Sequence, residues 1–204
     1  MRIFETKTAP NARRVRMFLA EKQLLDSVEF VQVDIQTGEN LSADYRKRNV
    51  TTKIPVMELE DGTCIGESVA ICRYFEALYP TPSLMGQTPL AQATIEMWQR
   101  RAEFHLLLPV GMCFQHTTGY FKDRMTPVPA YGEVCGKQAL EFMATLNDHL
   151  AASQYLAGDT FSIADITALC ALDFARVVKL RPAPELTHLL RWHAEVSARP
   201  SAKV

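Results

Sequence analysis

The pattern of hydrophobic residues changes near the middle of the chain, from short runs typical of strands to longer stretches with helical spacing. The run Val28–Val33 is rich in β-branched and aromatic residues and predicts a strand. Ahead of it, Val15, Phe18 and Leu19 share one helical face, and the helix they predict follows a short opening strand at 2–5. Because a strand–helix–strand unit crosses over with a right hand, the first two strands should be parallel.

A hairpin and a second helix complete the first half of the chain. Asp61–Gly62 lies between the runs 55–59 and 63–65, and this dipeptide is a strong hairpin signal, so two antiparallel strands are expected. A helix should begin at Glu67–Ser68 and end before the run 79–83, whose prolines cannot continue it. The polar stretch between the second strand and the hairpin carries no regular element in this prediction.

From about residue 89 onward the pattern predicts helices alone. No strand alternation or hairpin dipeptide occurs there, and prolines separate the helical stretches. Inside the first stretch, Pro109 and Gly111 should kink the helix, because proline removes a backbone donor and crowds the preceding turn. The expected helices lie near 89–118, 132–152, 162–179 and 185–198.

Composition and charge limit the class of protein. The chain has 204 residues, 48% of them hydrophobic, which suffices for a core without disulfides. A net charge of -1 gives no overall field to attract nucleic acid or an anionic membrane surface. No apolar stretch has the length of a signal-peptide core or a membrane span, and the five cysteines show no C-x-x-C pair or zinc spacing. We therefore expect a cytoplasmic protein with no metal, no nucleic-acid partner and no membrane association.

Four local motifs point to a particular family. Glu67–Ser68 opens a helix, where backbone donors and the positive end of the helix dipole favour a carboxylate. Lys53–Val56 places a proline directly before the hairpin, and Phe161–Ile166 contains a Ser-x-x-Asp capping box inside a hydrophobic staple. With the loop and helix at 9–19, these motifs follow the order found in the cytosolic glutathione transferases. The chain resembles that family, and its bacterial members in particular.

The resemblance implies the glutathione transferase fold, an α+β domain followed by an all-α domain. Residues 1–79 would form a thioredoxin-like domain, with βαβ-ββα order and a mixed four-stranded sheet, that binds glutathione. A linker at 80–88 would lead to a helical bundle at 89–204, which shapes a pocket for a second substrate and much of a homodimer interface. Four residues of its first long helix would lie at that interface: Trp98, Arg100, Arg101 and Glu103.

Five residues match the positions at which the family holds the glutathione tripeptide. Pro55 would be a cis-proline, and the backbone of Ile54 before it would contact the cysteinyl part. The hydroxyl and amide of Ser68 would bind the γ-glutamyl carboxylate, and the Glu67 side chain would face the α-amino group. The ammonium group of Lys53 would meet the glycine carboxylate, and a solvated surface lysine is the alternative.

Catalysis in this family needs the glutathione thiol as a thiolate. A free thiol has a pKa of about 8.5, and lowering it by about two units takes roughly 2.7 kcal/mol. The loop 5–11 contains no Tyr, Ser or Cys, the residues that most members use. Pro10–Asn11 resembles the Nu-class, or disulfide-reductase-like, subgroup, but Ala9 replaces its threonine. The candidates are the amide of Asn11, which is also a plausible helix N-cap, and the hydroxyl of Thr8.

Two further groups of residues have a structural and a functional interpretation. Met112, His116 and Tyr120 would lie near the second-substrate pocket by resemblance, and core packing is the alternative for each. The basic run Arg13–Arg16 spreads over different faces at helical spacing, so we expect a solvated helix surface and no anion site.

The resemblance as a whole implies a glutathione S-transferase in detoxification, which activates the thiolate for conjugation to a hydrophobic electrophile. Two alternatives stay open at this point. The likeness to the Nu class points to a glutathione-dependent disulfide reductase or peroxidase. The absence of Tyr, Ser and Cys from the first loop also allows a non-catalytic interaction protein with the same fold.

Overall fold

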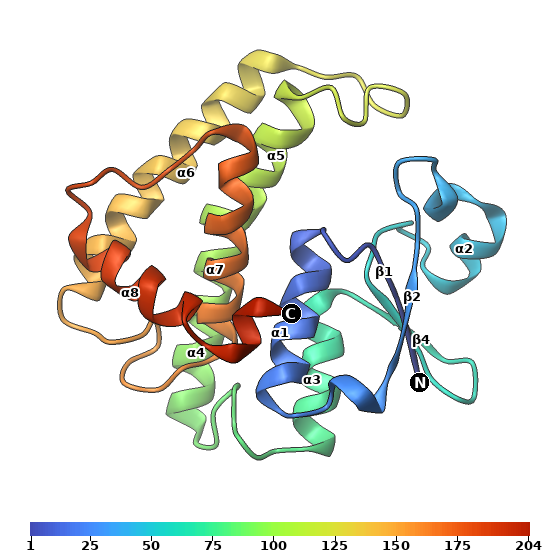
Figure 1. The fold of residues 1–204 in the computed structure, drawn as a ribbon, viewed down its shortest axis with the longest axis horizontal. Helices are drawn as coiled ribbons and strands as arrows, with labels where there is room; N and C mark the ends of the chain where they lie inside the picture. Colours follow the sequence, from blue (N-terminus) through green and yellow to red (C-terminus); the bar gives the residue numbers. More distant parts are fainter. The chain divides into compact units, whose positions relative to one another are not determined.

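The computed structural model describes every residue from Met1 to Val204. The chain divides into two compact units: unit 1 is Met1–Ser83 with Lys203–Val204, and unit 2 is Leu84–Ala202. The division falls inside the predicted linker at 80–88. All four strands belong to unit 1, and unit 2 is built of helices (Figure 1). This confirms the expected class, a mixed sheet domain followed by a helical one.

The sheet of unit 1 has four strands in the order β2-β1-β3-β4. β1 (Arg2–Glu5) pairs in parallel with β2 (Glu29–Gln32) and antiparallel with β3 (Val56–Glu58). β4 (Cys64–Gly66) pairs antiparallel with β3 and completes the hairpin. The parallel pair and the hairpin confirm the predicted topology.

Two helices form the main core of unit 1. α1 (Pro10–Glu21) and α3 (Ser68–Leu78) pack against each other, as Figure 1 shows. Phe18 and Phe75, one from each helix, are fully buried, and Ile3 of β1 is fully buried as well. Because side chains alternate along a strand, the next residue of β1 points to the opposite face of the sheet. That second face needs a cover of its own.

The cover of the second face is a short helix that the sequence pattern did not predict. α2 (Ala43–Arg48) begins at Ser42, whose hydroxyl oxygen accepts the N–H of Tyr45 at 3.1 Å. Tyr45 is its one buried residue, in a cluster with Phe4, Val33 and Val56. Six residues with one apolar contact give no helical periodicity, which explains why the stretch looked irregular. Two 3₁₀ turns lie nearby: η1 (Leu25–Ser27) and η2 (Glu39–Leu41).

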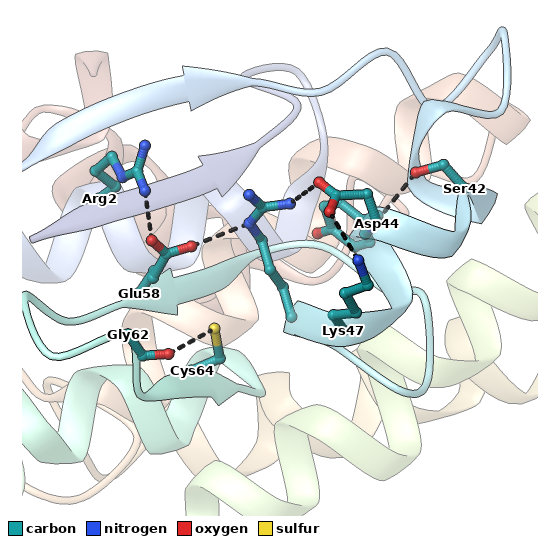
Figure 2. Close-up of polar contacts among 9 residues, drawn as sticks. Arg2, Ser42, Asp44, Lys47, Glu58, Gly62 and Cys64 are labelled. Atoms are coloured by element: carbon teal, nitrogen blue, oxygen red, sulfur yellow. Dashed lines mark hydrogen bonds and ion pairs between the residues drawn. The ribbon is translucent and has the colours of Figure 1, made fainter.

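A chain of charged side chains fastens α2 to the sheet (Figure 2). Glu58 of β3 accepts hydrogen bonds from Arg2 and from Arg48, the latter at 3.0 Å. Arg48 also donates to Asp44 at 2.7 Å, and its guanidinium lies 4.7 Å from the centre of the Phe4 ring. Bonding to Arg2 and Arg48 lowers the pKa of the Glu58 carboxyl. The short helix is therefore held by charge and stacking as well as by Tyr45.

Unit 2 has a long first helix that is interrupted where proline was expected to disturb it. A π-helical turn, η3 (Glu103–Leu107), separates α4 (Pro89–Ala102) from α5 (Leu108–Thr117), just ahead of Pro109. None of the helices combines the length and apolar character that a membrane crossing would need. The remaining elements of unit 2 are α6 (Pro129–Leu150), α7 (Ile163–Ala175), η4 (Arg176–Val178) and α8 (Thr187–Ser197), and η5 (Pro200–Lys203) ends the chain.

The buried helix α7 starts at the predicted capping box. The Ser162 hydroxyl accepts the N–H of Ala164, and the Asp165 carboxylate accepts the N–H of Ser162 at 3.0 Å. Asp165 also accepts the N–H of Leu156 at 3.0 Å and the indole N–H of Trp192 at 2.8 Å. Its complete burial raises the pKa of Asp165 to about 6, although these bonds oppose the shift. The capping box thus ties α7 to α8 and to the preceding loop.

We predict that Asp165→Asn lowers stability by a pH-dependent amount. The amide could still accept from Leu156 and Trp192, but its NH₂ group would meet the N–H of Ser162, and an unpaired buried donor costs about 1–3 kcal/mol. The native pKa of Asp165 lies above its unfolded value of about 3.9, so the wild type loses stability as pH rises from about 4 to about 6. Urea unfolding of both proteins from pH ~4 to ~7 should show the largest difference at the acid end. A difference that does not vary with pH would contradict the raised pKa.

Candidate functional site

The first loop of unit 1 leads into a helix whose start has no side-chain cap. α1 has Ala9 at its N-cap and Pro10 at the first helical position, so the expectation that Asn11 is the N-cap is wrong. Proline has no N–H and its fixed φ suits the first position, which moves Asn11 into the first turn. The first-turn N–H groups of Asn11 and Ala12 have no partner within the helix. Such a helix start favours a negative charge.

The start of α3 lies beside the start of α1. The Ser68 hydroxyl donates a hydrogen bond of 3.0 Å to the backbone carbonyl of Asn11, and Ser68 is only 5% exposed. Glu67, at the N-cap of α3, makes no side-chain cap and has φ of 63° and ψ of 122°. A left-handed φ is strained for a residue other than glycine, and such strain is concentrated at functional sites. Two uncapped helix starts therefore meet at one place, where an anion is doubly favoured.

The arginines of α1 do not form the solvated surface that the sequence predicted. Arg14 is 4% exposed, and its Nη1 donates to Oδ1 of Asn11 at 2.9 Å. Arg16 pairs with Glu5, which is fully buried, through its Nε at 2.7 Å. Arg13 is half-buried. Helical spacing correctly predicted that these side chains lie on different faces of α1. It gave no information on burial, and two of those faces are covered.

The loop before β3 has the expected cis bond, between Ile54 and Pro55. The backbone N–H and carbonyl of Ile54 make no hydrogen bond with other backbone groups, so both are available to a ligand. The carbonyl of Lys53 accepts hydrogen bonds from the Tyr45 hydroxyl at 3.1 Å and from Nδ2 of Asn49 at 2.8 Å. The Lys53 side chain is exposed. The structure therefore fixes the backbone on one side of the unpaired Ile54.

Asn49 is a residue of this region that the sequence analysis missed. Its Oδ1 accepts from both the N–H and the hydroxyl of Thr51, at 3.1 and 2.8 Å. A Cβ added to Gly66 would lie 3.3 Å from Nδ2 of Asn49, so glycine lets β4 approach this amide. Asn49 thus joins the loop before β3 to the strand that leads into α3. An asparagine that bonds the backbone two residues on is the sequence signal that could have found it.

The two threonines of the first loop differ in their hydrogen bonding. Thr6 donates its hydroxyl proton to the carbonyl of Val33 at 2.6 Å, which ties the loop to the end of β2. The Thr8 side chain is exposed and makes no hydrogen bond within the protein. Thr8 therefore keeps a free hydroxyl, whereas Thr6 does not.

The three residues expected near a second-substrate pocket all belong to unit 2. Met112 and His116 lie on α5 and are half-buried, and Nδ1 of His116 accepts the N–H of Val128 at 3.0 Å. Tyr120, in the following loop, is 41% exposed and its ring lies 5.2 Å from that of Phe114. A separate pocket of about 200 Å³ in unit 2 has a different lining: Trp98, Arg101, His105, Phe142 and Thr145.

Trp98, expected at a dimer interface, packs inside its own unit. It is 7% exposed and its ring stacks on His149 with centroids 3.9 Å apart. Arg100 on the same helix is exposed and donates to Glu96 at 2.9 Å and to Glu103 at 3.2 Å. Of the predicted interface residues, Arg100 and Arg101 are thus exposed, Glu103 is half-buried and Trp98 is buried.

Two other features of the site chemistry can be stated directly. All five cysteines are free thiols, and none belongs to the first loop or to the starts of α1 and α3. No group of three His, Cys, Asp or Glu side chains has an arrangement that could hold a metal ion.

Known protein families match the sequence in both units of the chain. Residues 8–78 match the sequence model of the glutathione S-transferase N-terminal domain, and residues 116–200 match that of the C-terminal domain. Glutathione S-transferase 2 of Saccharomyces cerevisiae is 39% identical over 205 residues, which cover 100% of this chain and 88% of the relative. A probable elongation factor 1-gamma 1 of Arabidopsis thaliana is 31% identical over 89% of this chain, but the chain spans only 45% of that protein.

Solved structures agree as well. The crystal structure of a glutathione S-transferase domain-containing protein of Marinobacter aquaeolei has a TM-score of 0.96 and 43% identity, covering 98% of this chain and 99% of that one. Gtt2 of Saccharomyces cerevisiae also has a TM-score of 0.96, with 39% identity over 100% of this chain and 99% of that chain. The expected likeness to bacterial members and to the Nu class stays a prediction. With both domains matched and close relatives along its whole length, the chain belongs to the glutathione S-transferase family of enzymes.

Proposed function

We propose that the protein binds glutathione at the joined starts of α1 and α3 and conjugates its thiolate to a hydrophobic electrophile. The observation that carries this proposal is the hydrogen bond from the Ser68 hydroxyl to the Asn11 carbonyl, which brings two uncapped helix starts together. Glutathione is an anion with two carboxylates and a thiolate. Such a site suits it, because helix starts stabilise negative charge.

Each part of the tripeptide has a proposed partner. The γ-glutamyl carboxylate binds the first-turn N–H groups of α3, including that of Ser68, whose hydroxyl proton is donated to Asn11, and Glu67 meets the α-amino group. The unpaired backbone of Ile54, ahead of Pro55, binds the cysteinyl part as an added strand residue would. The exposed ammonium of Lys53 pairs with the glycine carboxylate.

Asn11 is the proposed stabiliser of the thiolate, with Thr8 as the second candidate. A hydrogen bond to a charged group contributes about 1.5–3 kcal/mol, and a helix start adds about 0.3–1. Together these match the roughly 2.7 kcal/mol that a two-unit decrease in the thiol pKa requires. In the reaction the sulfur attacks an electrophilic carbon, a carbon–sulfur bond forms, and the leaving group departs with its electron pair. The thiol proton has by then gone to solvent.

The proposal also covers the second substrate, the oligomeric state and the location of the protein. Met112, His116 and Tyr120 are proposed to contact the second substrate. The working form is a cytoplasmic homodimer without a metal, and sedimentation equilibrium tests its mass. Disulfide reduction through glutathione is the second candidate, favoured by the Pro10–Asn11 pair.

Removal of the Ser68 hydroxyl should weaken glutathione binding. Ser68→Ala removes the bond to Asn11 that joins the two helix starts, and a neutral hydrogen bond contributes about 0.5–1.5 kcal/mol. The dissociation constant measured by isothermal titration should rise about two- to tenfold. Ser153→Ala is the matched control, because that hydroxyl also donates to a backbone carbonyl, of Tyr155 at 2.7 Å in unit 2, and should leave affinity unchanged. An unchanged constant in Ser68→Ala would remove Ser68 from the site.

Removal of the Asn11 amide should raise the pKa of bound glutathione. Asn11→Ala deletes one hydrogen bond to the sulfur, so the thiol pKa should rise by roughly one to two units. The measurement is the ultraviolet absorbance of the bound thiolate against pH, with Thr8→Ala beside it. A larger rise in Thr8→Ala would exchange the two roles. No rise in either variant would mean that backbone donors alone activate the sulfur.

Titration with both forms of glutathione, followed by a panel of substrates, tests the function as a whole. Binding of the reduced form alone and turnover of an aryl halide are expected. Tight binding of the oxidised form and turnover of a mixed disulfide, or turnover of an organic peroxide, would favour the second candidate. Binding of neither form would contradict the proposal and favour the non-catalytic interaction protein.

A further inference from the structure

The side-chain amide of Asn11 is held by a buried guanidinium. Arg14 lies one turn further along α1, is 4% exposed, and donates a hydrogen bond of 2.9 Å to Oδ1 of Asn11. Arginine has five donors and no acceptor, so the amide atom that faces it must be the oxygen. The nitrogen of the Asn11 amide, with its two N–H groups, therefore points away from Arg14.

We infer that Arg14 is a positioning residue, which orients the Asn11 amide so that its N–H groups face the sulfur of glutathione. The inference rests on the role proposed for Asn11. A thiolate only accepts hydrogen bonds, whereas an asparagine amide has a donor end and an acceptor end of nearly the same shape. An amide free to turn would present its oxygen to the sulfur part of the time and repel the negative charge. The hydrogen bond from Arg14 to the amide oxygen prevents that orientation.

The backbone of Asn11 is fixed independently of its side chain. The carbonyl accepts the Ser68 hydroxyl of α3 at 3.0 Å, and the side chain accepts Arg14 of α1 at 2.9 Å. One bond therefore sets where the residue lies, and the other sets which way its amide points. The charged residues next to these contacts are Arg13 on the same helix and Glu67 beside Ser68, so a loss of positive charge must be separated from a loss of orientation.

The test is the pKa of bound glutathione in Arg14→Met. Methionine fills a buried site of similar length without any donor. We expect the thiol pKa to rise by about one unit, a tenfold loss of thiolate below that pKa, in the same direction as in Asn11→Ala. The pH profile of kcat/KM for the electrophile at saturating glutathione should move by the same amount. The dissociation constant of glutathione, measured at pH ~5.5 where the bound thiol stays protonated, should change by less than about threefold, since the Ser68 site is intact.

Controls separate orientation from charge and from folding. Arg13→Met removes the same charge from the neighbouring, half-buried position and should leave the thiol pKa unchanged. Arg14→Lys keeps a donor and should restore most of the wild-type value. If Arg14→Met does not fold in a thermal melt, Arg14→Gln replaces it. Glutamine offers both a donor and an acceptor, so part of the rise is expected.

The outcomes distinguish this inference from the proposed function. A raised pKa in Asn11→Ala with an unchanged pKa in Arg14→Met, or in Arg14→Gln where that variant replaces it, would overturn the positioning role and leave the function standing. An equal rise in Arg13→Met and Arg14→Met would assign the effect to charge and also overturn it. An unchanged pKa in Asn11→Ala would refute the role of Asn11 itself, and the role of Arg14 with it.

Discussion

The hydrogen bond from Ser68 to the carbonyl of Asn11 is the contact on which the proposed site depends. It brings together the starts of α1 and α3, each of which carries partial positive charge, so the two ends would repel each other without it. Neither start has a side-chain cap, whereas the hydroxyls of Ser42 and Ser162 cap α2 and α7. The missing caps leave the first-turn N–H groups of α1 and α3 available to a ligand. The arrangement is most stable with an anion bound.

Buried charges hold α1 in the position that this contact requires. In the middle of the helix, Arg16 pairs with the fully buried Glu5 at the end of β1. At its end, Nζ of Lys22 donates to the carbonyls of Tyr79 and Pro82, at 2.6 and 2.8 Å, beyond the end of α3. Burial of charge costs desolvation energy, so such pairs contribute little net stability. Their effect here is geometric, because each of these interactions is made only when the helix lies in this position.

Much of the fold followed from local signals in the sequence. The parallel first pair of strands, the hairpin at Asp61–Gly62 and the capping box before α7 were each predicted from such signals. The errors arose where distant residues decide. α2 is six residues long and is stabilised by Tyr45 and by Arg48 contacts to the sheet, which no periodicity reveals. The burial of Arg14 depends on what covers its face of α1. The N-cap error is different, because it is local: Pro10, the neighbour of Asn11, takes the first helical position.

The absence of Tyr, Ser and Cys from the first loop need not mean the absence of catalysis. A hydroxyl presents its donor by rotation about one bond, whereas an amide donates only if its orientation is fixed. An asparagine can therefore replace a hydroxyl at the sulfur provided that a second group holds its oxygen. The change of one residue in the loop then creates a requirement for a buried donor behind it. Arg14 bonds that oxygen within one turn of the same helix, so the proposed activating group and its proposed support belong to a single rigid element.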